Sequence, residues 1–443
     1  MRRRNILELL IQISVLTVLA TLYGLSLLSN PPRYWESIAV SAAFVVLFGA
    51  GCVRLVPTLL STLMGEETHM RREGDRTFRR CGTRELTKLF LIVFAVRLLE
   101  FPLTYIVHYA LFGYTGTFFE IQRLWLDFYH PETSFPLYGY LSDVFWIVTV
   151  NFNHARFIGS YLFTALAVVA LYYLVQLDFD RRIARRTVRY FLVMPFALTL
   201  MGTVPDGLFI LFSVLTLLFL RKEQFPLASL FAFLAVLTHA LGALLFFPVL
   251  FGYASHLIGN VRQNRETGNR YILRQVLNLL SIALIPFGVG LVMLYSRLRF
   301  GDAMSLYSLA LGKSGPSYNG LLAWNDSAFS LVRTIGGNST AILCGTYAAQ
   351  FAYLLFGGVM LLLACKTIPT TFALLMAVTL PAIVMTGHVS DTARVVTMTT
   401  PFVITLAARV KRRWVDAVVT VVLLAGWVAY FFAFIAGFTG GGL

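Results

Sequence analysis

Charged residues are scarce in this sequence: only 13% of its 443 residues are Asp, Glu, Lys or Arg, whereas 58% are hydrophobic. Soluble globular domains carry about 25% charged residues, so this composition excludes a water-soluble fold. A membrane-spanning helix needs about 20 mostly apolar residues, and the chain offers roughly a dozen such runs. We therefore expect an all-α polytopic integral membrane protein, and a Rossmann-type catalytic domain is excluded because too little polar sequence is left for one.

Cysteine is equally scarce. The four residues Cys52, Cys81, Cys344 and Cys365 have neither paired nor metal-ligand spacing, and most lie in or beside apolar runs. They predict no disulfide framework and no zinc site. No cofactor motif is evident, but a divalent metal stays open, because one ion held by scattered carboxylates would leave no local pattern.

Acidic residues are fewer than basic ones: 21 Asp and Glu stand against 36 Lys and Arg, and the formal net charge is +15. The basic residues form short clusters between apolar runs, the pattern that sets topology in membranes, so membrane lipids rather than nucleic acid are the expected partners. Placing the clusters in the cytoplasm places the N-terminus there as well. The first apolar run, Ile6–Leu28, has no small-residue cleavage site after it and predicts a retained anchor. The clusters are Arg2–Arg4, Arg71–Lys88, Arg181–Arg189, Arg221-Lys222, Arg262–Arg274, Lys366 and Arg409–Arg413.

The apolar runs predict about thirteen spans. The predicted spans are 6–29, 36–61, 87–112, 155–176, 187–203, 206–220, 226–239, 240–256, 275–297, 341–364, 368–386, 396–410 and 415–437. Residues 135–152 are apolar but short and carry Asp143. If they spanned, the cluster Arg181–Arg189 would lie outside, so a re-entrant or interfacial helix is expected there. The break between the short spans 226–239 and 240–256 is either a true end or a kink.

Two long stretches, 113–154 and 298–340, are expected outside the cytoplasm, and loops of this length are usually functional or disordered. The first holds Glu120, Arg123 and Asp127 at spacings that would share one face of an interfacial helix. Its carboxylates are candidates for acid–base chemistry. The alternative is that they are solvated loop charges and that Arg123 only pairs with them. Asp206, which follows Pro205, is another candidate, or simply a helix cap.

Several short motifs occur in an order that resembles one family. Phe135-Pro136-Leu137-Tyr138-Gly139 is similar to the Phe-Pro-Leu-Tyr-Pro signature of the PIG-V type mannosyltransferases, integral membrane glycosyltransferases of the GT-C fold. The motifs that follow it are Met194-Pro195-Phe196-Ala197, Pro205-Asp206-Gly207-Leu208-Phe209, the segment Leu227–Gly242 ending in Thr238-His239-Ala240-Leu241-Gly242, and Ser390-Asp391-Thr392-Ala393-Arg394 with Pro401-Phe402. The resemblance covers roughly residues 87–410.

The resemblance implies a division of the chain and a set of roles. Residues 1–86 would form a two-helix membrane segment with a basic cytoplasmic loop, and 87–443 a GT-C-like transferase domain of about thirteen spans with a structured first large loop. The family keeps an acidic residue soon after the helix that precedes this loop, but Gly113–Thr117 has none. The nearest acids, Glu120 and then Asp127, are the candidate catalytic bases. The expected donor-phosphate or substrate-binding residues are Arg123, Tyr138, Asp206, His239, His388, Asp391 and Arg394.

The chemistry that such a protein needs is available outside the membrane. Arginines such as Arg394 and Arg123 bind phosphate with two hydrogen bonds, and a carboxylate can activate an acceptor hydroxyl. We expect inverting transfer of a sugar, which the resemblance implies is mannose, from a polyprenyl-phosphate-linked donor to a glycan, lipid or protein acceptor. The expected location is the plasma membrane of a bacterium or the endoplasmic reticulum of a eukaryote. Two alternatives stay open: a transporter or lipid flippase, for which the intramembrane charges Arg97 and Glu100 would speak, and a GT-C-like scaffold without catalytic activity.

Overall fold

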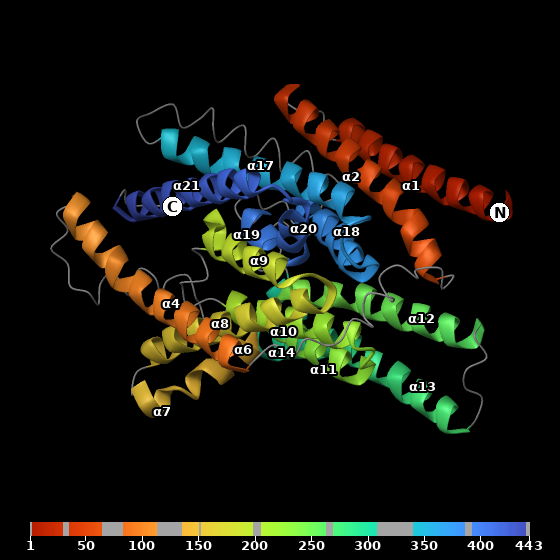
Figure 1. Ribbon diagram of the computed structural model, residues 1–443, viewed down its shortest axis with the longest axis horizontal. Helices are drawn as coiled ribbons and strands as arrows, with labels where there is room; N and C mark the ends of the chain where they lie inside the picture. The colour runs from red at the N-terminus through yellow and green to blue at the C-terminus, as the bar shows by residue number, and fades with distance from the viewer. Residues whose placement is uncertain are drawn as a thin grey trace. The chain divides into compact units, whose positions relative to one another are not determined.

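In a computed structural model the described part of the chain is built from helices, and no strand occurs in it (Figure 1). The residues described are 2–29, 35–63, 83–112, 135–149, 152–197, 205–262, 269–307, 340–385 and 392–439. This agrees with the all-α class expected from composition. Five helices are long and apolar enough to cross a membrane: Ser41–Leu63, Ala155–Asp178, Ala240–Val261, Tyr271–Phe300 and Arg413–Phe431. The larger number of spans and the GT-C arrangement stay predictions.

The chain divides into two compact units that alternate along the sequence. The first unit holds residues 1–76, 244–282 and 307–409, and the second holds 77–243, 283–306 and 410–443. This division by contacts differs from the sequence boundary expected at residue 86, which stays a prediction.

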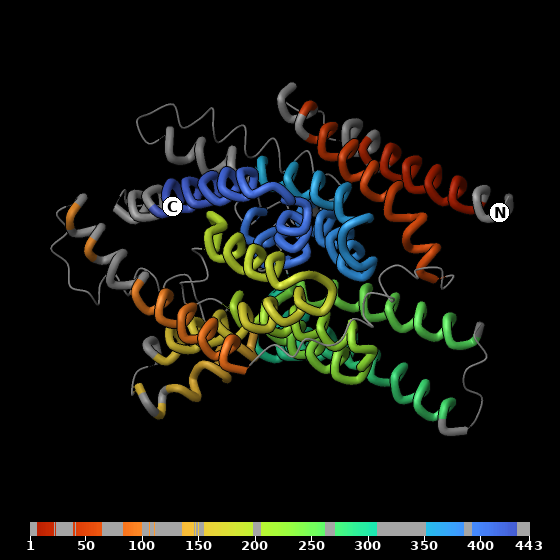
Figure 2. Tube along the Cα trace, viewed as in Figure 1, coloured from red at the N-terminus to blue at the C-terminus, as the bar shows by residue number. Residues whose placement is uncertain are grey.

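In the first unit, α2 (Trp35–Leu63) is the central helix. It packs against α1 (Arg2–Ser29), α12 (Phe246–Arg262), α17 (Thr340–Ala364) and α18 (Thr370–Met385), and α1 and α2 follow each other along the red end of the trace in Figure 2. Small residues allow the close approach of α2 and α17, since a Cβ added at Gly51 would lie 2.9 Å from Cγ of Leu361. The remaining helices of this unit are α13 (Asn269–Ile282), α19 (Thr392–Met398) and α20 (Pro401–Arg409).

In the second unit, α8 (Phe152–Asp178) is the central helix. Its neighbours are α4 (Thr83–Phe112), α6 (Pro136–Asp143), α7 (Trp146–Thr149), α9 (Arg181–Val193) and α10 (Asp206–Arg221). Thr164 and Ser160 of α8 lie close to Gly207 of α10, where a small residue permits a close contact. The unit is completed by α11 (Phe225–Val236), which packs on α10 and on α14 (Leu284–Phe300), and by α21 (Arg413–Thr439), which packs on α9 and α4.

Two of the expected spans are wrong as continuous helices. The helix expected over 187–203 begins at Arg181, inside the basic cluster, and ends at Val193, because Met194 takes an extended conformation before Pro195. The helix expected over 396–410 is interrupted at Thr399 and Thr400, and a new helix begins at Pro401. In each case a proline sets the boundary.

Two other expectations concern short segments. Residues 135–152 contain α6 and α7, helices of 8 and 4 residues, so this segment does not form one spanning helix. The break expected near Thr238–Gly242 is real: α11 ends at Val236, and the chain continues through a 3-10 helix, η2 (Ala240–Leu245), into α12.

Candidate functional site

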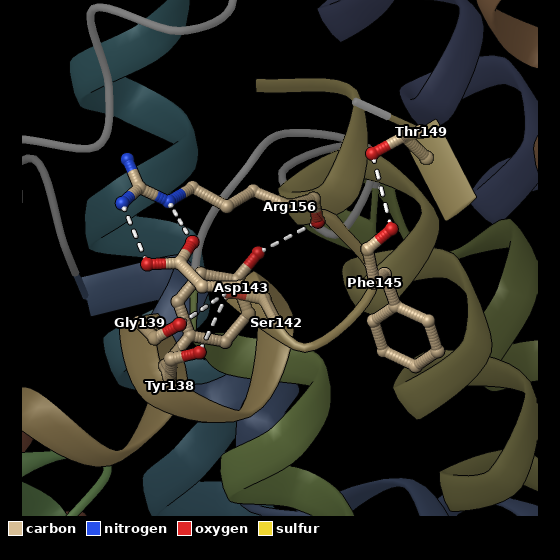
Figure 3. Close-up of polar contacts among 7 residues, drawn as sticks. All are labelled: Tyr138, Gly139, Ser142, Asp143, Phe145, Thr149 and Arg156. Carbon is tan, nitrogen blue, oxygen red and sulfur yellow. Dashed lines mark hydrogen bonds and ion pairs between the residues drawn. The ribbon is translucent and has the colours of Figure 1, made fainter. Parts of the chain in front are cut away.

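The segment Phe135–Gly139 folds into α6, which lies on the N-terminal part of α8. Pro136 occupies the first helical position, where a missing N–H costs nothing. Tyr138 and Ser142 face inward and are fully buried. The hydroxyl of Tyr138 donates a hydrogen bond of 3.0 Å to the carbonyl oxygen of Arg156 (Figure 3). Tyr138, expected to bind substrate, therefore fastens α6 to α8 in this structure, and its role toward substrate stays a prediction.

Asp143, the last residue of α6, forms an ion pair with Arg156 near the start of α8 (Figure 3). Nε of Arg156 lies 3.0 Å from Oδ1 of Asp143, and Nη2 lies 3.3 Å from Oδ2. The Arg156 side chain is 15% exposed and that of Asp143 30%. Two parallel contacts fix the orientation of both groups, as in guanidinium sites for carboxylate or phosphate. The third guanidinium nitrogen points away from Asp143 in Figure 3.

His239 contacts two aromatic rings from different parts of the sequence. Its ring is stacked on Phe135 with centroids 6.4 Å apart, and the ring of Phe209 lies 5.1 Å away. The backbone N–H of Leu241 donates to Nδ1 of His239 at 3.1 Å. Nδ1 is therefore the acceptor nitrogen, and in the neutral ring the proton sits on Nε2.

A backbone hydrogen bond reinforces the same contact. The N–H of Leu137 in α6 donates to the carbonyl oxygen of Leu237 at 3.3 Å. Leu237 is the C-cap residue that follows α11, and its carbonyl has no further helical turn to bind. The start of α6 thus satisfies a backbone acceptor at the end of α11.

Asp206 and Gly207 open α10 beside α8. Asp206 is fully buried in the first turn, where the helix dipole favours a negative side chain. Pro205 holds the N-cap position, so Asp206 is not the cap itself. A Cβ added at Gly207 would lie 2.4 Å from Oγ1 of Thr164, so only glycine allows the two helices to approach this closely.

These contacts bring together three motifs that are far apart in the sequence. Phe135–Gly139, Pro205–Phe209 and Thr238–Gly242 meet through the ring of His239 and the backbone bond between Leu137 and Leu237. All three belong to the second unit. Asp143 lies at the end of α6 opposite Phe135, and its partner Arg156 lies near the start of α8.

The outer face of α6 and α7 is apolar and exposed. Tyr140, Val144 and Ile147 are 69%, 59% and 77% exposed, and their spacing places them along one side of the two short helices. An exposed apolar row next to a buried polar face is typical of a segment in contact with lipid chains.

The other expected site residues are divided between undescribed segments and the first unit. The residues outside the described part of the chain are Glu120, Arg123, Asp127, His388 and Asp391. Arg394 is half-buried in α19, which belongs to the first unit. The structure therefore brings Tyr138, Asp206 and His239 into one unit, and the other site residues stay predictions.

Arg156 was not foreseen as a site residue. The signal for it is the isolated acid in the apolar segment 135–152, because a partly buried carboxylate requires a cation. Arg156 is the first arginine or lysine after Asp143 in the sequence. The two side chains meet because α6 packs on α8, which spacing alone does not reveal.

Arg97, expected as a functional charge of a transporter, lies in α4 and is fully buried. Its Nη1 donates to the carbonyl oxygen of Ala197 at 3.4 Å, at the end of the Met194–Ala197 motif. The side chain of Glu100 is not described. Arg97 thus has a structural contact within the second unit.

Within the described ranges, no group of three or more His, Cys, Asp or Glu side chains is placed to hold a metal ion. Cys52 and Cys365 are free thiols. Comparison with known proteins identifies no family: no protein-family model, no curated protein and no solved structure matches this chain.

Proposed function

We propose that this protein transfers a sugar, with mannose as first choice, from a polyprenyl-phosphate-linked donor to an extracytoplasmic glycan, lipid or protein acceptor. The observation that supports this most is the meeting of Phe135–Gly139, Pro205–Phe209 and Thr238–Gly242 around His239. The resemblance to GT-C mannosyltransferases rests in part on these three motifs. Motifs related only by chance would have no reason to lie side by side in the folded chain.

The reaction needs a base and a phosphate-binding cation. The acceptor oxygen attacks the anomeric carbon, its proton passes to a carboxylate, and the bond from the anomeric carbon to the phosphate oxygen breaks. The electron pair of that bond leaves with the polyprenyl phosphate, which needs no protonation. Attack from the opposite side inverts the anomeric centre.

Glu120 remains the first candidate for the base and Asp127 the second, because they follow α4 most closely. Arg394 and Arg123 remain the candidate phosphate ligands. Arg156 joins them, because its guanidinium already binds an anionic group in the two-pronged geometry that phosphate takes. A donor phosphate on Arg156 would release the carboxylate of Asp143 toward the acceptor.

The apolar row Tyr140, Val144 and Ile147 suits the lipid part of such a donor. A polyprenyl chain lies in the hydrocarbon layer, while its phosphate stays at the membrane surface. The ion pair lies at the C-terminal end of α6, and the apolar row runs along α6 and α7. These two short helices therefore offer contacts for both parts of a lipid-linked donor.

The test uses the purified full-length protein in liposomes with polyprenyl-phosphate mannose labelled in the sugar, supplied with a membrane extract as the source of acceptor. We expect label in a new product and stoichiometric release of polyprenyl phosphate. Movement of intact donor across the liposome bilayer without its cleavage would show a flippase and contradict the proposal. If the folded protein neither moves nor cleaves the donor, the transferase and flippase hypotheses are both contradicted, and a scaffold without catalytic activity is the hypothesis that remains.

A further inference from the structure

The helix α9 carries five arginines and divides them between two faces. Arg181, Arg182, Arg185 and Arg189 are exposed, whereas Arg186 is buried on the side that packs on the unit. The helix is therefore amphipathic, with a cationic outer face. A helix of this pattern is typical of the membrane surface rather than of its interior.

Two carboxylates hold α9 in place, and each of them binds two arginines and a tyrosine. Glu85 of α4 accepts hydrogen bonds from Arg181, Arg185 and the hydroxyl of Tyr172. Asp416 of α21 accepts from Arg189 and from the hydroxyl of Tyr190, and it pairs with Arg186. Each end of α9 is thus tied to a different helix by one acid shared between two arginines and a tyrosine.

These two acids leave a cationic excess next to them. Arg182 on α9 and the run Lys411, Arg412 and Arg413 at the start of α21 are exposed. None of these four side chains forms an ion pair within the described residues. Besides Glu85 and Asp416, the acid next to these cations is Asp180, the exposed residue before α9. Four exposed cations and one exposed acid therefore accompany the ion pairs of Glu85 and Asp416.

The ends of candidate spans place this surface at the level of the lipid headgroups. The span Ala155–Asp178 ends three residues before Arg181, and the span Arg413–Phe431 begins at Arg413. Trp414 beside it is 62% exposed, and tryptophan is enriched where the membrane meets water. The helix α9 is bonded to the start of α21 through Asp416.

We propose that the outer face of α9 and the start of α21 form a binding surface for acidic phospholipids, with Arg182 and Arg412 as contacts to the lipid phosphate. The four exposed cations are complementary to an anionic headgroup layer, and each is worth about fivefold in affinity for an acidic membrane surface. The surface is separate from the proposed transferase site and does not depend on it.

The test measures binding of fluorescent phosphatidylglycerol to the purified full-length protein in a neutral detergent, with phosphatidylcholine as the reference lipid. The double variant Arg182→Gln/Arg412→Gln removes two cations without breaking an ion pair. We expect its affinity for phosphatidylglycerol to fall about twentyfold and its affinity for phosphatidylcholine to stay unchanged. Arg182→Lys/Arg412→Lys should keep most of the binding, which separates loss of charge from loss of fold.

The matched control is Arg297→Gln/Arg299→Gln, which removes two exposed cations from the last turn of α14 in the same unit. We expect less than about a twofold change there. An equal loss in the control variant, or equal binding of both lipids by the unaltered protein, would overturn the proposal. Equally tight binding of glycerol 3-phosphate would also overturn it, because the ligand would then be a soluble phosphate.

Discussion

Arg156 holds Asp143 by two parallel hydrogen bonds of 3.0 and 3.3 Å, near the start of the helix whose last residue, Asp178, is held by Arg221. The two ends of α8 therefore carry ion pairs of the same chemical type. Only the first of them lies beside the three converging motifs. A substitution in the Arg156–Asp143 pair therefore has a matched control in the Arg221–Asp178 pair at the other end of α8.

Replacing Arg156 by Lys should lower sugar transfer at least about tenfold, because a lysine keeps the charge but cannot make the two-pronged contact with phosphate. Arg221→Lys alters the same kind of ion pair away from the motifs and should retain transfer. The measurement is the initial rate of labelled-sugar transfer, together with the melting temperature of each variant. Equal losses in the two variants would show that the effect is general to ion pairs of α8.

Glu120→Gln should leave a folded, membrane-inserted protein that still binds the donor but transfers sugar at least about a hundredfold more slowly, because loss of a general base typically costs about 10²–10⁴-fold. Donor binding and transfer are measured separately. A fully active Glu120→Gln together with an inactive Asp127→Asn would reverse the order of the two candidates. If both variants keep full activity, Asp143→Asn becomes the variant to measure.

Gly207→Ala should destabilise the second unit by about 1–3 kcal/mol, because the added Cβ would lie 2.4 Å from Oγ1 of Thr164 and 3.1 Å from its backbone nitrogen. The control is Gly290→Ala in α14, where no atom outside the helix backbone lies within 4 Å of the added Cβ. That substitution should be neutral or slightly stabilising. Unfolding in mixed detergent micelles measures both. Equal stability of the two variants would mean that α8 and α10 do not approach closely.

Acid should loosen the tie between α4 and α9. Burial raises the pKa of Glu85, but hydrogen bonds from Arg181, Tyr172 and Arg185 outweigh burial and hold this pKa below its ordinary value. A carboxyl with a lowered pKa stabilises the folded state fully above its unfolded pKa of about 4.3, and the contribution is lost as pH falls through the folded value. The difference in melting temperature between the unaltered protein and Glu85→Gln should therefore shrink below about pH 4. A difference that stays constant to about pH 3 would refute this.

The topology is tested by single cysteines at Thr117 and Thr133, placed in a chain whose four native cysteines are replaced by serine. An impermeant thiol reagent added from the extracytoplasmic side should label both, because both positions lie in the stretch predicted to face that side. A cysteine at Arg182, which is exposed on α9, is the control for the cytoplasmic side. Labelling of Thr117 and Thr133 positions only from the cytoplasm would overturn the topology and the predicted base together.

The sequence predicted the helical class and the positions of most helices, because apolar runs and prolines act locally. The same local rule explains where it failed. The run 187–203 is apolar enough to span, but Pro195 ends the helix at Val193, and the helix begins among the arginines of the basic cluster. Hydropathy averages over such a window and does not register the proline.

The candidate site was only partly predictable. The motifs around Tyr138, Asp206 and His239 were recognised one by one, but nothing in their spacing states that His239 stacks on Phe135 and lies against Phe209. Such contacts depend on the packing of α6, α10 and the end of α11, at sequence separations that carry no periodic signal. Arg156 was missed for the same reason, since its partner Asp143 lies on another helix, α6.

The tie between Arg189 and Asp416 joins residues that are 227 positions apart in the chain. At a synthesis rate of about 5–20 residues per second, the arginine leaves the ribosome roughly 10–45 seconds before the acid that holds it. During that interval the partner of α9 in α4, Glu85, has been synthesised, whereas its partner in α21, Asp416, has not. A chain cut before residue 416 would therefore lack the carboxylate that binds Arg189.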